Sequence, residues 1–354
     1  MPMAVGYNSP NTFADEGWAD GMAWKVLTSA RAFWVSGQAA QAALEAAGCE
    51  AVPSLRPGPF SAEEAISMLQ GCDAVIASSE PYNAQVFAAC PQLKLVARCG
   101  VGTDAVDMAA AAEAGVVVTN TPGAMTEAVA DYTFALMLGI ARRLPESDAM
   151  MRSGGWDEFR GVLVYGKTLG LVGVGRIGQA VAQRAKGFSM RVLAYDPILQ
   201  ASGKAAPGIE FVTLEELLAQ SDYVSAHAPS LPETVKMFNA ERFAQMKPTA
   251  YFINTARGTL VDEADLLAAL QGGIIAGAAI DVYAKEPCPA DSPLRHAPHC
   301  VLTPHNAFNA AESTVEMSRQ SAQSILDLMQ GRLPDNICNP AVWNSPNLRV
   351  PRPA

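Results

Sequence analysis

One stretch, from Lys167 to Pro197, restricts the possible folds of this chain more than any other. It opens with a short apolar run at 169–172, passes through a G-x-G-x-x-G pattern, and reaches a second apolar run at 192–195 that ends in Asp196. Between the glycines and the second run, apolar residues recur with helical spacing. The stretch therefore predicts a buried strand, a tight turn, a helix and a second parallel strand with an acid at its end.

The three glycines have different physical tasks in such a turn. Gly173 lets the chain leave the strand sharply, Gly175 lets a pyrophosphate approach the backbone, and Gly178 lets helix and strand pack closely. The helix then directs its free N–H groups and the positive end of its dipole at the phosphates. Glycine-rich loops are common, so the pattern alone is weak. The strand before it, the helix after it and the terminal acid favour a dinucleotide site over a turn needed only for packing.

Asp196 indicates which dinucleotide is bound. Its carboxylate can accept hydrogen bonds from both ribose hydroxyls of an adenosine. A 2′-phosphate at the same place would meet this negative charge, and no basic residue stands beside Asp196 to neutralise it. The sequence therefore predicts NAD rather than NADP as the cofactor.

Composition narrows the class of protein. A chain of 354 residues, of which 50% are hydrophobic and 17% charged, suits two α/β domains with large buried sheets. The formal net charge of −10 argues against nucleic acid and anionic membranes as partners. No apolar run approaches the length of a membrane span, and the N-terminus lacks a signal-peptide pattern. Seven scattered cysteines without a C-x-x-C pair indicate reduced thiols and a cytoplasmic protein, and we predict no metal site.

Apolar runs alternate with helical patterns on both sides of the nucleotide unit. This alternation predicts parallel sheets, and the N-terminal one lacks a full dinucleotide fingerprint. The expected strands are 25–28, 51–52, 74–77, 93–97 and 116–119 before the unit, and 211–212, 223–226, 250–253, 277–280 and 300–302 after it.

Four other segments complete the expected organisation. Residues 1–23 are predicted to be an irregular extension, and 127–144 a long apolar helix buried on several sides. Residues 145–166 are expected to be rich in loops and to form a contact surface in an oligomer. A last helix is predicted over 310–329, followed by a Pro/Asn-rich tail from Pro334 that we expect on the surface.

Because ligands of open α/β sheets bind at the carboxyl ends of the strands, the residues after each strand are candidates for the site. After 93–97, a glycine-rich loop at 98–104 offers backbone N–H groups to a carboxylate, although a plain loop is the alternative. Arg257 follows 250–253 and can clamp a carboxylate at two points. A single arginine at a strand end is, however, more often a surface residue.

Two further strand ends carry an acid and a base. Asp281 ends the strand 277–280, within range of a bound nicotinamide. His305 follows 300–302 and is one of four histidines, of which His227 also stands at a strand end. Beside Glu286, His305 would form an acid/base pair in which the carboxylate favours the imidazolium and fixes its tautomer. Position alone leaves a structural role for His305 open.

Together these segments resemble the D-isomer-specific 2-hydroxyacid dehydrogenases, a family that includes phosphoglycerate dehydrogenase-like enzymes. The resemblance extends over roughly residues 74 to 330 in the family's order. The segments that carry it are 98–107, 120–131, 167–197, 246–262, 276–287 and 303–307.

The resemblance implies an α/β fold with two Rossmann-like doubly wound domains. A discontinuous substrate domain would comprise 1–122 and 308–354, and an NAD-binding domain 123–307. It also implies that His305 donates and accepts the proton with Glu286 as its partner, and that Arg257 and the backbone of Val101 and Gly102 bind the substrate. The residues implied to bind the cofactor are Gly173, Gly175, Arg176, Ile177, Gly178, Asp196, Pro229, Thr255 and Asp281.

The implied reaction is reversible hydride transfer between NAD(H) and C2 of a small anionic D-2-hydroxy or 2-keto acid, in a homodimer that associates through 123–166. Two alternatives stay open: a catalytically silent NAD-sensing protein, and a formate or phosphite dehydrogenase on the same fold. The chain also departs from the family, because Phe308 stands where a glycine pair is common and would narrow the pocket. Arg31 or Arg98 would meet a second anion such as phosphate, or be a surface residue.

Overall fold

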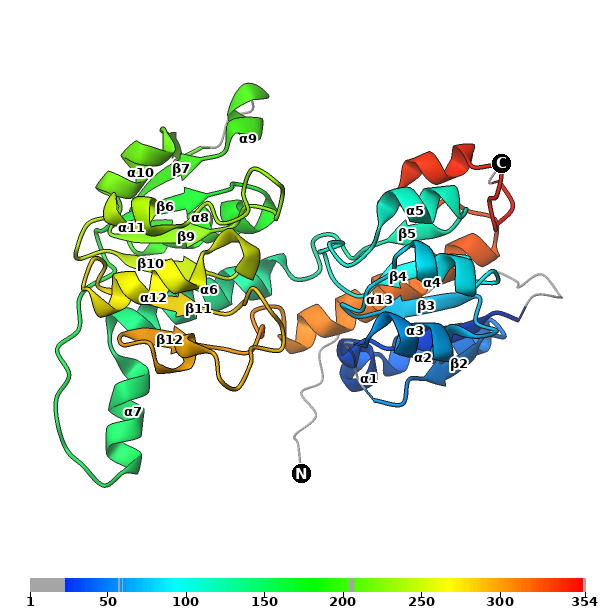
Figure 1. The fold of residues 1–354 in the computed structure, drawn as a ribbon, viewed down its shortest axis with the longest axis horizontal. Helices are drawn as coiled ribbons and strands as arrows, with labels where there is room; N and C mark the ends of the chain where they lie inside the picture. The colour runs from blue at the N-terminus through cyan, green and yellow to red at the C-terminus, as the bar shows by residue number, and fades with distance from the viewer. Residues whose placement is uncertain (1–22, 57, 59, 204–206, 353–354) are drawn as a thin grey trace. The chain divides into compact units, whose positions relative to one another are not determined.

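The computed structural model describes residues 23–56, 58, 60–203 and 207–352, and the chain divides into two compact units (Figure 1). Unit 1 comprises Met1–Met125 and Ala310–Ala354, and unit 2 comprises Thr126–Asn309. This division lies close to the predicted domain boundaries. Each unit is built on one parallel sheet with helices on both faces, which confirms the predicted doubly wound α/β class. The predicted extension, 1–23, lies outside the described residues except for its last residue.

Unit 1 holds a five-stranded sheet in the order β2-β1-β3-β4-β5, with all neighbours parallel. Helices α3, α4 and α5 cover one face, and α1, α2 and α13 pack together on the other. The strands are β1 (Lys25–Thr28), β2 (Glu50–Pro53), β3 (Ala74–Ala77), β4 (Leu95–Arg98) and β5 (Val117–Thr119). The helices are α1 (Arg31–Ser36), α2 (Gln38–Ala46), α3 (Ala62–Leu69), α4 (Ala84–Ala89), α5 (Met108–Glu113), α13 (Ala311–Met329) and the 3-10 turn η3 (Pro340–Asn344).

The C-terminal tail was expected on the surface, and this prediction is wrong for its middle part. Asn339 is only 4% exposed, and its side-chain amide donates to Val116 O and accepts from Val118 N, both at 2.9 Å. Val342 is fully buried. Since β5 is an edge strand, its outer backbone groups need partners, and the tail supplies them.

Unit 2 holds a seven-stranded parallel sheet in the order β12-β11-β10-β9-β6-β7-β8. Helices α6 and α8 pack on one face, and α10, α11 and α12 on the other. The strands are β6 (Thr168–Val172), β7 (Arg191–Tyr195), β8 (Glu210–Phe211), β9 (Tyr223–Ala226), β10 (Tyr251–Asn254), β11 (Gly277–Ile280) and β12 (Cys300–Leu302). The helices are α6 (Thr126–Ala141), α7 (Leu144–Arg152), α8 (Arg176–Gly187), α9 (Pro197–Ala201), α10 (Leu214–Gln220), α11 (Ala240–Ala244) and α12 (Glu263–Gln271), with 3-10 turns η1 (Gly258–Leu260) and η2 (Pro293–His296).

The strand order reverses between β6 and β9, because the chain crosses from β8 at one edge back to the middle of the sheet. Such a switch point leaves a crevice at the carboxyl ends of the two central strands, where ligands of open α/β sheets bind. The predicted glycine turn follows β6, so the fold of unit 2 places it at this crevice.

The segment after α6 differs from the prediction of a loop-rich passage only in its first part, since residues 153–166 form neither helix nor strand. The apolar helix ends at Ala141, Arg143 adopts a left-handed conformation with φ 53°, and α7 then runs from Leu144 to Arg152. Pro145 lies in the first turn of α7, where its fixed φ suits a helix and its missing N–H is not needed. None of the residues of α7 is buried, so the helix lacks the apolar stripe by which a sequence reveals one.

Three sequence expectations concern features of the whole chain. Within the described ranges, no helix is long and apolar enough to cross a membrane. All seven cysteines are free. No cluster of three or more His, Cys, Asp or Glu side chains capable of holding a metal ion occurs among the residues that the structure describes.

Candidate active site

The glycine turn after β6 has the geometry that its sequence predicts. Gly173 has φ +95°, and a Cβ there would lie 2.7 Å from the backbone of His227 and Ala228. A Cβ on Gly178 would lie 2.4 Å from Gly173 O, so helix and turn pack too closely for a side chain. By contrast, a Cβ on Gly175 would meet no atom within 4 Å. The open side of Gly175, at the uncapped N-terminus of α8, fits the approach of a pyrophosphate.

Asp196 connects the end of β7 to this turn. Its Oδ2 accepts a hydrogen bond from Val174 N at 2.8 Å, and its Oδ1 accepts one from Leu199 N at 2.9 Å as the N-cap of α9. Each oxygen of an ionised carboxylate has a second lone pair, so both can still accept from a ribose hydroxyl. The other predicted contacts of this half of the cofactor have open surface: Arg176 and Pro229 are exposed, and Ile177 is half-buried.

His227 lies at the end of β9 and has a structural role. Its Nε2 lies 2.9 Å from Ser225 Oγ, and its backbone forms the surface against which Gly173 packs. Burial lowers the pKa of His227 to about 4, so the ring is neutral near neutral pH. Of the two histidines at strand ends, His227 therefore does not have the charge expected of a proton donor.

Glu286 and His305 form the predicted pair. Nδ1 of His305 lies 2.6 Å from Oε2 of Glu286, while Oε1 of Glu286 accepts from Tyr283 N at 3.0 Å. Burial alone would raise the pKa of Glu286, but the hydrogen bond and charge of His305, the Tyr283 N–H and the charge of Arg257 together lower it. An ionised carboxylate only accepts hydrogen bonds, so Nδ1 of His305 carries a proton. Nε2 of this partly exposed ring is left to exchange a proton with a ligand.

Asp281 holds the loop that carries His305. The Asp281 side chain is fully buried, and its carboxylate accepts from Thr303 Oγ1 at 2.6 Å, from Asn306 N at 2.8 Å and from Ala307 N at 2.9 Å. Its carbonyl accepts from His305 N at 2.7 Å. These four bonds hold His305 at φ +50°, a left-handed conformation that a non-glycine residue adopts only when its surroundings fix it. The role of Asp281 toward the cofactor stays a prediction.

Arg257 is brought to the same place by close backbone packing. A Cβ on Gly258 would lie 1.9 Å from Tyr283 C, so only glycine lets the Arg257 loop rest on the segment that leads to Glu286. The sequence did not single out Asn254, which braces this loop by donating to Arg257 O at 2.8 Å and accepting from Ala256 N at 3.0 Å. The sequence signal for this role of Asn254 was its position directly before the loop that carries Arg257.

The remaining predicted residues occupy two places. In unit 2, Thr255 is 8% exposed, and its hydroxyl lies 3.0 Å from the hydroxyl of Thr133 on α6. In unit 1, Val101 and Gly102 follow β4 at the carboxyl end of its sheet and are half-buried. Unit 2 thus contains every predicted catalytic and cofactor residue, and unit 1 contains the predicted carboxylate loop.

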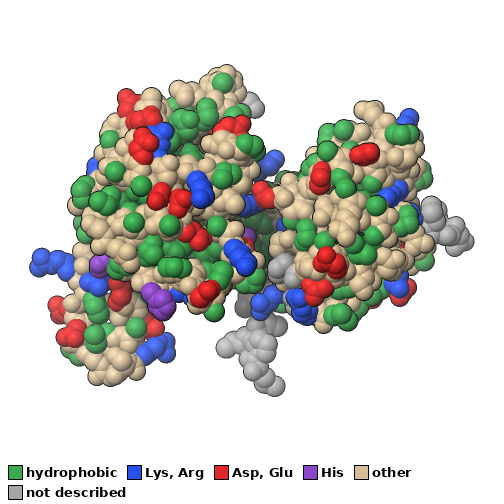
Figure 2. Space-filling view, in the orientation of Figure 1, with side chains coloured by type: hydrophobic (Ala, Val, Ile, Leu, Met, Phe, Trp, Pro, Cys, Tyr) green, Lys and Arg blue, Asp and Glu red, His purple; other side chains and the backbone are tan. Residues whose placement is uncertain are grey.

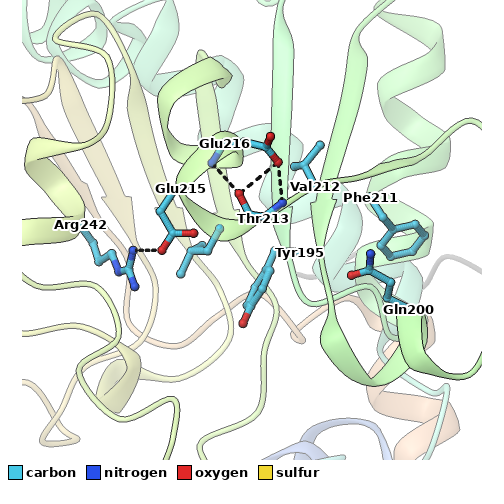
Figure 3. Close-up of a pocket in the computed structure, with 9 residues that line it drawn as sticks. Tyr195, Gln200, Phe211, Val212, Thr213, Glu215, Glu216 and Arg242 are labelled. Carbon is cyan, nitrogen blue, oxygen red and sulfur yellow. Dashed lines mark hydrogen bonds and ion pairs between the residues drawn. The ribbon is translucent and has the colours of Figure 1, made fainter.

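A cavity of about 470 Å³ lies beside β7 in unit 2 (Figure 3). Its lining includes Tyr195, which directly precedes Asp196, and the N-terminal turn of α10, where Thr213 and Glu216 form a capping box. Arg242 and Glu215, which are paired at 2.6 Å, also line it. None of the predicted site residues lines this cavity, so the candidate site is defined by the strand ends.

The comparisons with known proteins agree with this geometry. Residues 134–307 match the model of the family described as "D-isomer specific 2-hydroxyacid dehydrogenase, NAD binding domain". A glyoxylate reductase of Korarchaeum cryptofilum is 43% identical over 291 residues, which cover 80% of this chain and 88% of that protein. The chain belongs to the D-isomer specific 2-hydroxyacid dehydrogenase family.

Two more comparisons show how much of this chain is similar to other proteins. The D-3-phosphoglycerate dehydrogenase of Mycobacterium tuberculosis H37Rv is 42% identical over 266 residues, which cover 74% of this chain but 50% of that protein. Among solved structures, the TT0316 protein of Thermus thermophilus superimposes with a TM-score of 0.79 at 38% identity, covering 89% of this chain and 99% of the other. The chain is thus an NAD-dependent oxidoreductase of the 2-hydroxyacid dehydrogenase type, and the residues that match the family's NAD-binding domain, 134–307, lie in unit 2.

Proposed function

We propose that this dehydrogenase interconverts a small, unphosphorylated 2-keto acid and the corresponding D-2-hydroxy acid, with His305 as the group that transfers the proton. The observation that carries the proposal is the 2.6 Å contact between Nδ1 of His305 and Glu286, beside Arg257. It leaves a histidine ring with one nitrogen held by an ionised acid and the other available to a substrate oxygen.

Bound NADH supplies the hydride for reduction, and NAD⁺ accepts it in oxidation. When the keto acid is reduced, Nε2 of His305 gives a proton to the oxygen on C2. The negative charge of Glu286 stabilises the protonated ring and keeps Nδ1 as the bonded nitrogen. In the reverse direction, Nε2 takes the hydroxyl proton, and Glu286 stabilises the imidazolium that results.

Carboxylate recognition is assigned to Arg257 and to the backbone N–H groups of Val101 and Gly102. A guanidinium provides planar paired donors that suit a carboxylate, and backbone amides add donors whose direction is fixed by the fold. Gly173, Gly175, Gly178 and the start of α8 are assigned to the pyrophosphate of the cofactor, and Asp196 to its adenosine ribose. The open side of Gly175 and the uncapped helix support this assignment.

Two observations favour a small substrate without a phosphate. Arg98, a candidate ligand for a second anion, is 9% exposed and donates inward to the carbonyls of Gly102 and Ala77. Phe308 lies edge-on to His305, with 6.0 Å between ring centroids. An aromatic side chain beside the proton donor limits the room for a long C3 substituent. Arg31, the other candidate ligand for a second anion, is exposed on α1.

An NADH-oxidation screen tests this proposal. Glyoxylate, pyruvate, hydroxypyruvate and phosphohydroxypyruvate should be compared at equal concentration, followed by chiral analysis of the product. We expect turnover of the unphosphorylated acids, a D-product where C2 becomes chiral, and much lower kcat/KM for phosphohydroxypyruvate. NADH binding without turnover of any of the four acids would instead favour the silent NAD-sensing protein.

Association into a homodimer through residues 123–166 is part of the proposal. Helix α7 has no buried residue, and large apolar side chains nearby are exposed, including Trp156 at 84% and Leu163 at 62%. A second copy that covers these side chains is the simplest explanation of their exposure. Mass measurement in solution, for the wild type and for Trp156→Glu, tests it: the substitution should shift the mass toward that of a monomer.

The remaining parts of the proposal concern location and other partners. Seven free cysteines support a cytoplasmic location, where thiols stay reduced. Figure 2 shows acidic and basic side chains interspersed over the face in view, and the net charge is −10. Both features support a protein that binds neither nucleic acid nor anionic membranes.

A further inference from the structure

Three consecutive carbonyl groups in the loop after β4 are each held by a hydrogen bond from a different donor. Thr121 N donates to Gly100 O at 3.0 Å, Asn120 Nδ2 donates to Val101 O at 2.9 Å, and Arg98 Nε donates to Gly102 O at 3.1 Å. Thr121 and Asn120 come from the segment that follows β5, the neighbouring strand, and Arg98 is the last residue of β4.

Holding these carbonyls also sets the direction of the N–H groups. In a trans peptide, the C=O of one residue and the N–H of the next point in opposite directions. All three peptides are trans. The bonds to Gly100 O, Val101 O and Gly102 O therefore orient the N–H groups of Val101, Gly102 and Thr103 away from the donors.

These N–H groups have no acceptor within the described part of the chain. The nearest backbone N–H groups with an acceptor on either side are that of Cys99, which donates to Ala77 O at 3.0 Å, and that of Val106, which donates to Thr103 O at 2.9 Å. Unpaired consecutive backbone donors in a half-buried loop are suited to a bound anion. The pattern separates a bonded carbonyl side of this loop from an open amide side.

Arg98 and Asn120 are themselves held in place. Arg98 is 9% exposed, and its Nη1 donates to Ala77 O at 2.8 Å, so its guanidinium bridges the ends of β3 and β4. The peptide of Asn120 is fixed by Asn336, which donates to Asn120 O and accepts from Asn120 N.

We propose that Arg98 and Asn120 are positioning residues for the substrate carboxylate, acting through the backbone amides of Val101, Gly102 and Thr103. Neither side chain contacts the substrate. They hold the carbonyl side of the loop, so its amide side stays directed at the carboxylate without reorganisation on binding. This inference rests on the proposed function, because it specifies how the carboxylate of the 2-keto acid is bound.

The test measures anion binding separately from turnover. Oxamate, an unreactive analogue of a 2-keto acid, is titrated calorimetrically into the enzyme–NADH complex for the wild type and for Arg98→Met, Arg98→Lys and Asn120→Ala. We expect each variant to bind oxamate about tenfold more weakly, in line with the loss of an oriented charge-assisted hydrogen bond. KM for glyoxylate should rise in parallel, while kcat and NADH affinity change by less than about twofold. Asn120→Ala keeps the test decisive if Arg98→Met does not fold.

Arg349→Met is the matched control. Arg349 also lies in unit 1 and donates to three backbone carbonyls, those of Phe87, Cys90 and Leu93, but it serves the end of α4 and not the loop. It should lower Tm without changing oxamate affinity. If Asn120→Ala binds oxamate as tightly as the wild type, the inference is overturned. It is also overturned if Arg98→Lys binds oxamate as tightly as the wild type while Arg98→Met binds it more weakly, because only the charge of Arg98 would then matter. Wild-type enzyme that neither binds oxamate nor reduces a keto acid would remove the proposed function as well.

Discussion

Glu286 lies 2.6 Å from His305, and the two residues reach this contact from segments that follow different strands of the same sheet. Glu286 follows β11, and His305 follows β12, the edge strand next to it. Because both strands are parallel, their carboxyl ends meet at one edge of the sheet. Arg257, after β10, completes a row of three neighbouring strand ends.

Replacement of Glu286 by Gln should weaken the acid/base pair without removing the hydrogen-bond acceptor. The amide has no charge, so the protonated form of His305 loses its stabilisation. We expect kcat/KM for keto-acid reduction to fall by about tenfold, in line with the loss of one charge-assisted hydrogen bond. Since the pKa of Glu286 is lowered from 4.5, wild-type enzyme should lose no activity through protonation of Glu286 above about pH 5. Unchanged kcat/KM in Glu286→Gln would contradict the pairing.

Replacement of His305 by Ala should remove proton transfer while leaving the cofactor site intact. The expected loss of turnover is about 10²–10⁴-fold, the usual contribution of a positioned acid or base. NADH affinity, measured by fluorescence, should change little because the glycine turn lies after a different strand. His296→Ala, at an exposed histidine of the same unit, is the control and should keep full activity. Unchanged turnover in His305→Ala would exclude the residue from the mechanism.

Replacement of Asp196 by Ser should alter the choice of cofactor. Serine can still cap α9, but it lacks the charge that would repel a 2′-phosphate. We expect the ratio of kcat/KM with NADH to that with NADPH to fall at least about tenfold, since charge-assisted hydrogen bonds to ribose are lost and repulsion is relieved. Asp262→Ser, at the N-cap of α12, controls for the effect of exchanging a cap. If the ratio stays constant, Asp196 does not select the cofactor.

The parts of the fold that could be predicted from sequence are those specified by local patterns. The glycine turn with its two strands depends on residues within one supersecondary unit. The sequence also predicted one shared edge of the sheet for Arg257, Glu286 and His305, because parallel strands align their carboxyl ends.

The features that were missed depend on contacts between residues far apart in the chain. Asn339 bonds to β5 more than 200 positions away, which a Pro/Asn-rich composition does not reveal. Arg98 points inward because Ala77 O and Gly102 O lie within its reach, whereas its sequence context equally suits a surface residue. Helix α7 has no buried face, so it leaves no apolar periodicity to detect.

Replacement of Gly258 by Ala should displace the loop that carries Arg257 from the backbone of Tyr283 and Ala284, on which it packs. The added Cβ would lie 1.9 Å from Tyr283 C and 2.4 Å from Ala284 N, so one of the two backbone segments must move. We expect a rise in KM for the keto acid, a fall in kcat and a lower Tm, with NADH affinity nearly unchanged. Gly187→Ala is the matched control, since a Cβ there meets no atom within 4 Å. A fully active Gly258→Ala enzyme would show that this close packing is not needed to position Arg257.

Replacement of Asp222 by Asn should make the stability of unit 2 less dependent on pH. The Asp222 carboxylate accepts from Thr168 N and from Lys247 Nζ, both at 2.9 Å, and joins the starts of β9 and β6. Partial burial opposes ionisation, but these two partners lower the pKa of Asp222 below its ordinary value of 3.8. A carboxyl with a lowered folded-state pKa stabilises the fold above its unfolded pKa, and this stabilisation is lost as pH falls through the folded value.

At pH 7 we therefore expect Asp222→Asn to reduce the free energy of unfolding by about 1.5–3 kcal/mol, the usual size for hydrogen bonds to a charged group. The difference from wild type should shrink below about pH 4 and disappear near pH 2, where both proteins carry an uncharged side chain at this position. Urea unfolding at a series of pH values measures it. Asp291→Asn, at an exposed aspartate of the same unit, should show no such pH-dependent difference. A constant deficit of Asp222→Asn across the pH range would mean that geometry rather than charge is responsible.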